Sequence, residues 1–205
     1  RTTQMEQIKH LILKDLSFRF KLGLLCFLFT WLFIFGIATS GKALFTYVLM
    51  LVPGLLFSGF IMYNCYLEDN YSTLTFLKSL PVSKKMLIQE KFLLSNLFIV
   101  IGIIETFIFY LLLPAIPFPF QLSHIFLSTA VMEIYFGTFL YLFYRFNFFA
   151  SRFPPNVFVM SLLFLHLKKI EFQSITIPLP LATVILIIAL IVNYLLMIVS
   201  IKKMR

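Results

Sequence analysis

Long apolar runs separated by short polar segments make up most of this chain. A bilayer core about 30 Å thick is crossed by about 20 apolar residues in a helix, and six runs approach or exceed that length. The predicted membrane spans are residues 22–39, 44–66, 92–113, 122–144, 155–167 and 179–201. The fifth run is the shortest, and its alternatives are a start near Phe146 or a partly re-entrant course. The pattern predicts an all-α integral membrane protein with a six-span transmembrane domain over residues 22–205.

The first 21 residues follow a different pattern. Apolar side chains recur there at helical spacing on one face, at Met5, Ile8, Ile12 and Leu16, while basic residues fall on the other faces. This arrangement predicts an amphipathic helix within residues 1–21 that lies in the membrane interface. The alternative interpretation is a plain basic flank of the first span.

The only extended polar stretch between apolar runs covers residues 68–91. Its first part, residues 68–80, predicts a short helix with an apolar stripe. Acidic residues stand near the start of this helix and a lysine near its end, where the helix dipole favours each sign of charge. The residues concerned are Glu68, Asp69, Leu74, Leu77, Lys78 and Leu80.

Pro81 ends this predicted helix, because the residue before a proline is pushed out of the α region. Ser83 then caps a second helix, which passes Lys84 and Lys85 and continues into the third span. The sequence therefore predicts a helix–proline–helix elbow, a stiff element that can pass a push from a soluble partner into the membrane. We expect the main docking surface of the protein on this stretch.

Composition supports the membrane assignment. The chain is 61% hydrophobic and 12% charged, against about 45–50% and about 25% for soluble proteins. The net charge of +9 is spread along the flanks of the apolar runs, so we expect no nucleic-acid partner. Cys26 and Cys65 both lie in apolar runs and are interpreted as small buried hydrophobes rather than a disulfide or metal pair.

The distribution of Lys and Arg predicts the orientation of the chain. With six spans, one side of the membrane collects nearly all of these residues, namely Arg1, Lys9, Lys14, Arg19, Lys21, Lys78, Lys84, Lys85, Lys91, Arg145, Arg152, Lys202, Lys203 and Arg205. The other side keeps only Lys42, Lys168 and Lys169. We therefore expect both termini in the cytoplasm. Residues 145–152 are interpreted as a basic anchor or, alternatively, as a second contact for a soluble partner.

Glu105 and Glu133 are the carboxylates placed inside predicted spans. Such residues usually face the bundle interior or a water-filled cavity, because an ionised group at mid-bilayer costs roughly 3 kcal/mol or more. Counting about 1.5 Å per helical residue, their depths differ by less than about 10 Å, which allows both to line one cavity. They either contact a cationic part of a substrate or, protonated or bonded to polar side chains of neighbouring helices, serve packing.

Signals for enzymatic chemistry are missing from the sequence. No nucleophile or metal ligand stands at a useful spacing beside the two intramembrane carboxylates, and His124 and His166 lack zinc-ligand spacing. The chain also has no Gly-x-x-x-x-Gly-Lys-Ser/Thr phosphate loop. We expect no catalytic residue, no metal and no cofactor in this chain, and any ATPase must be a separate chain.

The segment around Pro81 resembles the loop after the second span in short bacterial ABC type-2 exporter permeases. The match is strongest over residues 79–85, Ser-Leu-Pro-Val-Ser-Lys-Lys, and includes Lys91 near the start of the third span. These permeases are six-span subunits that include those of peptide and lantibiotic exporters. The chain departs from larger members in residues 168–178, which are too short for an elaborate external domain.

The resemblance implies a set of partners and roles. The chain would be a transmembrane subunit in a bacterial cell membrane, paired with a second copy or a paralogue. A separate ATP-binding subunit, carrying ATP and magnesium, would dock through the loop containing Glu68–Lys85, called the coupling helix, within the predicted coupling loop at residues 68–91. Export, in place of import, rests on this resemblance alone.

Two functions from different classes fit the sequence. The first is the permease half of an ATP-driven exporter, whose 27 Phe and 7 Gly suit a cavity for amphipathic or hydrophobic cargo, with peptide favoured over lipid or drug and alternating access as the mechanism. The second is a non-transporting membrane sensor or scaffold that holds a cytoplasmic partner at the bilayer. A stiff junction at Pro81 distinguishes the two functions. A transporter needs it so that movement of the loop reaches the third span, whereas a scaffold needs the loop only for binding.

Overall fold

A computed structural model describes residues 4–18, 20–39, 45–70, 83–112, 121–153 and 177–203, together with Val157 and Ser161. Within these residues the regular structure is entirely helical. The helices are α1 (Gln4–Phe18), α2 (Phe20–Thr39), α3 (Phe45–Asn70), α5 (Lys84–Leu112), α6 (Leu122–Arg145), α7 (Phe148–Ser151) and α9 (Leu179–Lys203). The all-α prediction is confirmed for this part of the chain.

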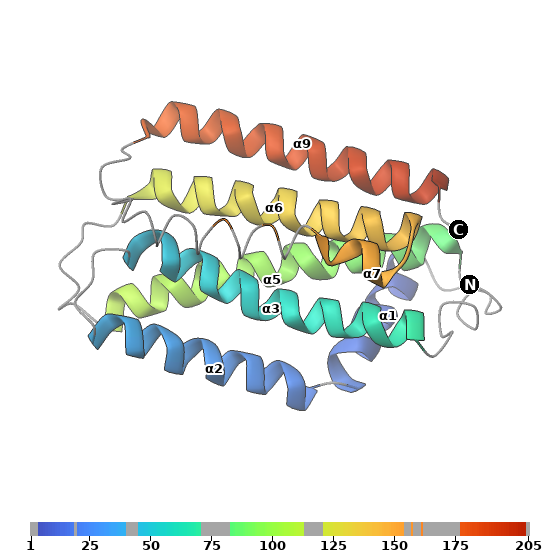
Figure 1. Ribbon diagram of the computed structural model, residues 1–205, viewed down its shortest axis with the longest axis horizontal. Helices are drawn as coiled ribbons and strands as arrows, with labels where there is room; N and C mark the ends of the chain where they lie inside the picture. Colours follow the sequence, from blue (N-terminus) through green and yellow to red (C-terminus); the bar gives the residue numbers. More distant parts are fainter. Residues whose placement is uncertain are drawn as a thin grey trace.

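The long helices form one bundle, and α1 crosses it at one end (Figure 1). α3 packs against α2, α5 and α6, and α9 packs against α6 and α5. The C-terminal ends of α3, α6 and α9, the start of α5 and the short α7 all lie at the end where α1 lies (Figure 1), which we call the α1 end. This arrangement brings segments far apart in the sequence to one place.

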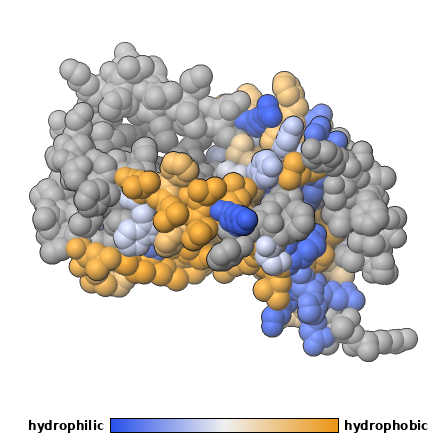
Figure 2. Space-filling view, turned by 90° about the horizontal axis from the view of Figure 1, so that it is seen from below, coloured by the Kyte–Doolittle hydropathy of each residue, from blue (hydrophilic) through white to orange (hydrophobic). Residues whose placement is uncertain are grey.

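Three described helices, α5, α6 and α9, are long and apolar enough to cross a membrane. α2 and α3, with 20 and 26 residues, run beside them (Figure 1). Apolar side chains of α9 such as Val184, Ile188 and Ile191 are more than half exposed, and lipid is the solvent that accepts such a surface. Figure 2 shows apolar residues along the flank of the bundle and hydrophilic residues gathered toward the α1 end.

Aromatic residues of α3, α5 and α6 fill the centre of the bundle. The largest fully buried ones include Phe60, Phe136, Phe139, Phe143 and Tyr144. The rings of Phe60 and Phe98 meet edge to face with their centroids 5.3 Å apart, a favoured geometry for aromatic pairs. Because lipid tails are as apolar as these side chains, close packing rather than water exclusion holds them together.

The charges of the described residues are unevenly placed along the bundle. At the α1 end, basic residues stand at the start of α5, at the end of α6, after α7 and at the end of α9, namely Lys84, Lys85, Arg145, Arg152 and Lys202. The helix ends described at the opposite end carry no Lys or Arg. Lys42, Lys168 and Lys169, which are predicted for the other side of the membrane, lie outside the described residues, and the predicted orientation stays a prediction.

The boundary predicted near Glu68 is wrong. α3 continues without a break through Glu68 and Asp69 to Asn70, so both carboxylates lie in the last turn of a long helix rather than in the first turn of a new one. The helix dipole disfavours negative charge there. Contacts with Lys91 and with the backbone of Phe148, described below, offset that disadvantage.

Several predictions fall outside the described residues. These are the remainder of the predicted short helix after Asn70, with Leu74, Leu77, Lys78, Leu80 and Pro81, and the fifth span, residues 155–167, apart from Val157 and Ser161. In the predicted N-terminal region, α1 covers residues 4–18 of the expected 1–21, and its place in the membrane interface stays a prediction.

Candidate functional site

The first turn of α5 begins as the sequence predicts. The Ser83 hydroxyl accepts a hydrogen bond from the backbone N–H of Met86 at 3.3 Å, and the Ser83 carbonyl accepts from the same N–H at 2.9 Å. This is the N-cap role expected of serine. Lys84 and Lys85 follow with exposed side chains, so the start of α5 presents positive charge at the α1 end.

Two turns further along α5, the Lys91 ammonium lies in a buried ion cluster, which consists of Lys91, Asp15, Glu68 and Glu90. The side chain of Lys91 is 3% exposed. It forms an ion pair with the Asp15 carboxylate of α1, a second with Glu68 of α3 at 2.8 Å, and a third with Glu90 at 3.7 Å. One cation therefore joins three helices.

The charges in the cluster depend on one another. Removing one partner from a buried ion pair typically costs about 3–5 kcal/mol, because an uncompensated charge is left away from water. Burial by itself raises the pKa of the Asp15 carboxyl, but Lys91, together with the exposed Lys14 at 3.3 Å, holds that pKa below its ordinary value of 3.8. Asp15 is therefore ionised at neutral pH.

A second set of contacts surrounds the ion cluster. The Asp69 carboxylate of α3 accepts a hydrogen bond from the backbone N–H of Phe148 at 3.0 Å, at the start of α7. Asn147 caps the same short helix by accepting from the N–H of Ala150 at 2.8 Å. The buried Tyr144 hydroxyl of α6 donates to the Leu87 carbonyl of α5 at 3.3 Å. The last turn of α3 is thus connected to α5 and α7.

The predicted docking residues therefore take different places. Glu68 is 7% exposed and points to Lys91, so its carboxylate is not presented to a soluble partner. Asp69 holds the start of α7, and Ser83 caps α5. Lys84 and Lys85 remain as exposed charges next to the segment 71–82.

Glu133 lies in a separate polar contact between the long helices. Its carboxylate accepts a hydrogen bond from the side-chain amide of Asn193 on α9, and the same amide is 3.5 Å from the Asn96 side-chain oxygen on α5. Gly137 makes room for Asn193, because a Cβ at this position would lie 2.5 Å from its Oδ1. This contact agrees with the packing interpretation of Glu133.

Glu105 has a different environment. The residue is 3% exposed, and both of its carboxylate oxygens are buried without a hydrogen-bond partner in the described part of the chain. Its neighbour Thr106 is satisfied locally, since the hydroxyl donates to the Gly102 carbonyl at 2.8 Å. Of the two membrane carboxylates, Glu105 is the one for which the described residues supply no hydrogen-bond partner.

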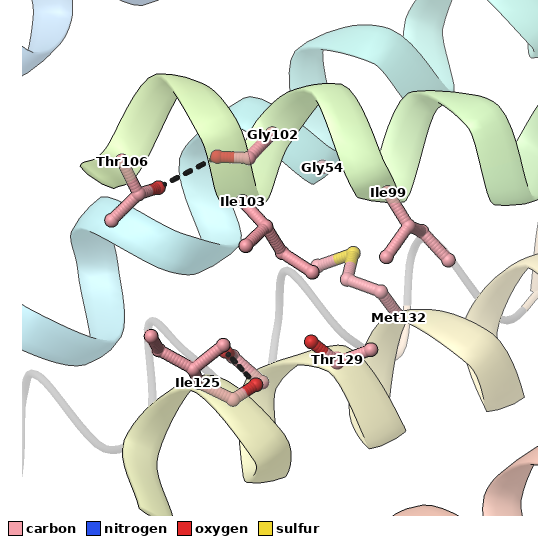
Figure 3. A pocket seen from close by; sticks show the side chains of 9 residues that line it. Gly54, Ile99, Gly102, Ile103, Thr106, Ile125, Thr129 and Met132 are labelled. Carbon is pink, nitrogen blue, oxygen red and sulfur yellow. Dashed lines mark hydrogen bonds between the residues drawn. The ribbon is translucent and has the colours of Figure 1, made fainter. Parts of the chain in front are cut away.

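A small cavity of about 20 Å³ lies between α3, α5 and α6 (Figure 3). Its lining comes from Gly54, Ile99, Gly102, Ile103, Thr106, Ile125, Ser128, Thr129 and Met132. The Met132 side chain fills the space beside Gly54, where a Cβ would lie 2.5 Å from the sulfur (Figure 3). Neither Glu105 nor Glu133 lines this cavity, and its volume suffices for about one water molecule.

The contacts of three residues in the ion cluster and at Glu133 were not predicted from the sequence. Asp15 occupies an apolar-face position of the N-terminal helix, three residues after Ile12, which is an unusual place for an acid. Lys91 follows Glu90 at the start of a long apolar run, and Asn193 is one of very few polar side chains in α9. Each is a polar residue at a position that the apolar pattern assigns to the interior. This mismatch is the sequence signal by which these contacts could have been found.

The described residues offer no group of three or more His, Cys, Asp or Glu side chains placed to hold a metal ion. The arrangement instead defines a helical membrane protein whose element ends are joined by buried charges beside a loop. The chain belongs to the ABC-2 family of transporter proteins, whose model matches residues 10–205. It is a membrane permease subunit of an ABC transporter, a class that works with an ATP-binding subunit. No curated protein and no solved structure is significantly similar to it.

Proposed function

We propose that this chain is the transmembrane subunit of an ATP-driven exporter in a bacterial cell membrane. The observation that carries the proposal is the family match over residues 10–205. The gathering of described basic residues at the α1 end supports an orientation in which that end, with both termini, faces the cytoplasm. The direction of transport rests on the resemblance of residues 79–85 to exporter loops.

In this proposal the ATP-binding subunit docks at the segment that begins after Asn70 and ends at Lys85. α3 and α5 flank that segment, and the exposed Lys84 and Lys85 at its end provide charge for a partner. ATP and magnesium belong to the ATP-binding subunit, and this chain carries no cofactor. Exposed Phe149 and Phe153 near α7 lie at the same end and suit the membrane interface beside the docking surface.

The cargo is amphipathic or hydrophobic, with a peptide favoured over a lipid or drug. The cavity of about 20 Å³ among the described residues is far smaller than any such molecule. In this proposal the transport path lies between this chain and a second copy or paralogue and opens by alternating access. Glu105, whose oxygens have no hydrogen-bond partner among the described residues, is the better candidate for contact with a cationic cargo group. Glu133 is engaged by Asn193.

A membrane sensor or scaffold is the second candidate. The small cavity and the engagement of Glu133 favour it, because a scaffold needs no path for cargo. It requires only that the α1 end binds a soluble partner.

Co-purification with candidate ATP-binding subunits, followed by ATP hydrolysis in lipid nanodiscs, tests the proposal. We expect a stable complex whose hydrolysis rate responds to amphipathic cationic peptides and in which Glu105→Gln weakens that response. A stable complex that ignores peptides moves the search for cargo to lipids and drugs. A complex that never hydrolyses ATP supports the scaffold, and the absence of any complex removes the proposed function.

A further inference from the structure

The ion cluster joins the two helices that precede and follow residues 71–82 in the sequence. Glu68 lies on α3 just before the segment 71–82, and Lys91 lies on α5 just after it, with their charged atoms 2.8 Å apart. α3 and α5, which flank the proposed docking segment, are therefore held together by this ion pair. A force applied to that segment reaches both helices together.

The same ammonium also binds the N-terminal helix. Asp15 of α1 is paired with Lys91 although 76 positions separate them in the sequence. α1 also makes apolar contacts with the bundle, with Ile8 buried and Ile12 and Leu16 packed against the central cluster. Apolar packing has little directionality, whereas an ion pair at contact distance fixes one helix relative to another.

Burial makes this junction a means of positioning rather than a source of stability. Buried ion pairs are often no more stabilising than apolar residues of similar volume, and their best-attested role is to specify one arrangement. Asp15, Glu68 and Lys91 are each less than one-tenth exposed. Their charges therefore do not serve to keep a surface soluble. A chain that needed only a stable bundle would be served equally well by leucine and methionine at these positions.

We propose that Lys91 is a positioning residue for ATP-driven transport, because it locks α1 and the adjoining ends of α3 and α5 into a single moving unit. When the ATP-binding subunit displaces the segment 71–82, α1 then moves with it. Without the ammonium, the subunit still docks and hydrolyses ATP, but α1 no longer follows. This inference rests on the proposed function.

The test follows α1 directly and needs no cargo. A cysteine at Met5, whose side chain is 81% exposed, carries an environment-sensitive fluorophore, with Cys26 replaced by alanine and the buried Cys65 left in place. The complete complex in lipid nanodiscs is compared with and without ATP and orthovanadate. The main variant, Asp15→Asn/Glu68→Gln/Glu90→Gln/Lys91→Met, removes all four charges of the ion cluster together, so that none is left unpaired. Lys91→Arg is the conservative variant, and Lys9→Met, an exposed lysine on α1, is the matched control.

We expect a nucleotide-dependent change of emission in the unaltered complex, in Lys9→Met and in Lys91→Arg. In the neutral quadruple variant we expect that change to fall about fivefold or more, the lower end of ordinary coupling between sites, while ATPase docking and hydrolysis persist. If the quadruple variant does not fold, Asp15→Asn takes its place, since Lys91 then keeps Glu68 and Glu90.

An unchanged emission response in the neutral quadruple variant, or in Asp15→Asn where that variant replaces it, overturns the inference and leaves the cluster a purely structural feature. That outcome does not touch the proposed function, because docking and hydrolysis are measured in the same samples. If the unaltered chain binds no ATP-binding subunit, the proposed function fails and the inference fails with it.

Discussion

At the scale of single residues, Lys91 and Asn193 show how polar side chains fix the contacts of an otherwise apolar bundle. Lys91 holds three carboxylates at the α1 end, and Asn193 holds Glu133 between α9 and α6. Inside lipid such contacts are specific because every neighbouring apolar surface is equivalent. Their removal therefore affects defined pairs of helices.

Replacing Lys91 with methionine keeps the length of the side chain and removes its charge. We expect the purified protein to lose about 3–5 kcal/mol of stability, because three carboxylates are left buried without their cation. Thermal unfolding in detergent measures the loss. Lys9→Met should leave the midpoint nearly unchanged, since Lys9 is exposed, and equal effects of the two variants would contradict the role of burial.

Gly137 offers a second test where α6 meets α9. An alanine there would place its Cβ 2.5 Å from Asn193 Oδ1 and 3.2 Å from Leu196 Cδ1, so we expect a destabilisation of about 1–3 kcal/mol from overpacking. Gly59→Ala is the matched control, because nothing lies within 4 Å of its Cβ. In that variant the better helix propensity of alanine should leave the protein equally or more stable. Unfolding midpoints of both variants decide the matter.

At the scale of elements, the last turn of α3 contacts two neighbouring helices, α5 and α7. Asp69 accepts the hydrogen bond of the Phe148 N–H, and Glu68 pairs with Lys91. Successive residues of one helix turn thus serve α7 and α5. A short helix such as α7, with 4 residues, depends on such outside contacts because its own hydrogen bonds are too few to sustain it.

Asp69→Ala should release the start of α7. We expect faster backbone amide hydrogen exchange at residues 148–151 with little change in α6, since the acceptor for the Phe148 N–H is lost. Hydrogen exchange with mass spectrometry on the protein in nanodiscs measures this directly. Asn147→Ala, which removes the cap on the Ala150 N–H, should have a similar local effect, and an unchanged exchange rate in both would show that α7 is held by packing alone.

Much of the fold is predictable from local sequence, and the ion cluster is not. Apolar runs of helical length predict α2, α5, α6 and α9 nearly in place, and Ser83 predicts the start of α5 because a cap acts within three residues. The extension of α3 through Glu68 was missed because its compensating charge, Lys91, lies more than twenty positions away. Asp15 and Lys91 are farther apart still, with 76 positions between them, and no local pattern specifies such a pair.

At the scale of the whole molecule, the α1 end and the opposite end differ in charge and in contacts. The described basic residues and the ion cluster both lie at the α1 end (Figure 1). Lys and Arg near membrane helices favour the cytoplasmic side. We therefore expect the α1 end to face the cytoplasm.

Single cysteines test this orientation in a chain with Cys26 replaced by alanine. We expect cysteines at Met5 and at Lys202 to react with a membrane-impermeant maleimide in inside-out vesicles and to be protected in right-side-out vesicles. A cysteine at Gln121, at the start of α6, should show the reverse. Reaction of Met5 and Lys202 positions from opposite sides would exclude an even number of crossings.

The contact between Glu133 and Asn193 also has a consequence for how the protein is made. The two residues are 60 positions apart, which at 5–20 residues per second corresponds to roughly 3–12 seconds of translation. During that interval Glu133 has left the ribosome without its amide partner. This contact cannot form before α9 itself is synthesised, so the nascent chain must keep the carboxylate near water or near the insertion machinery until α9 arrives.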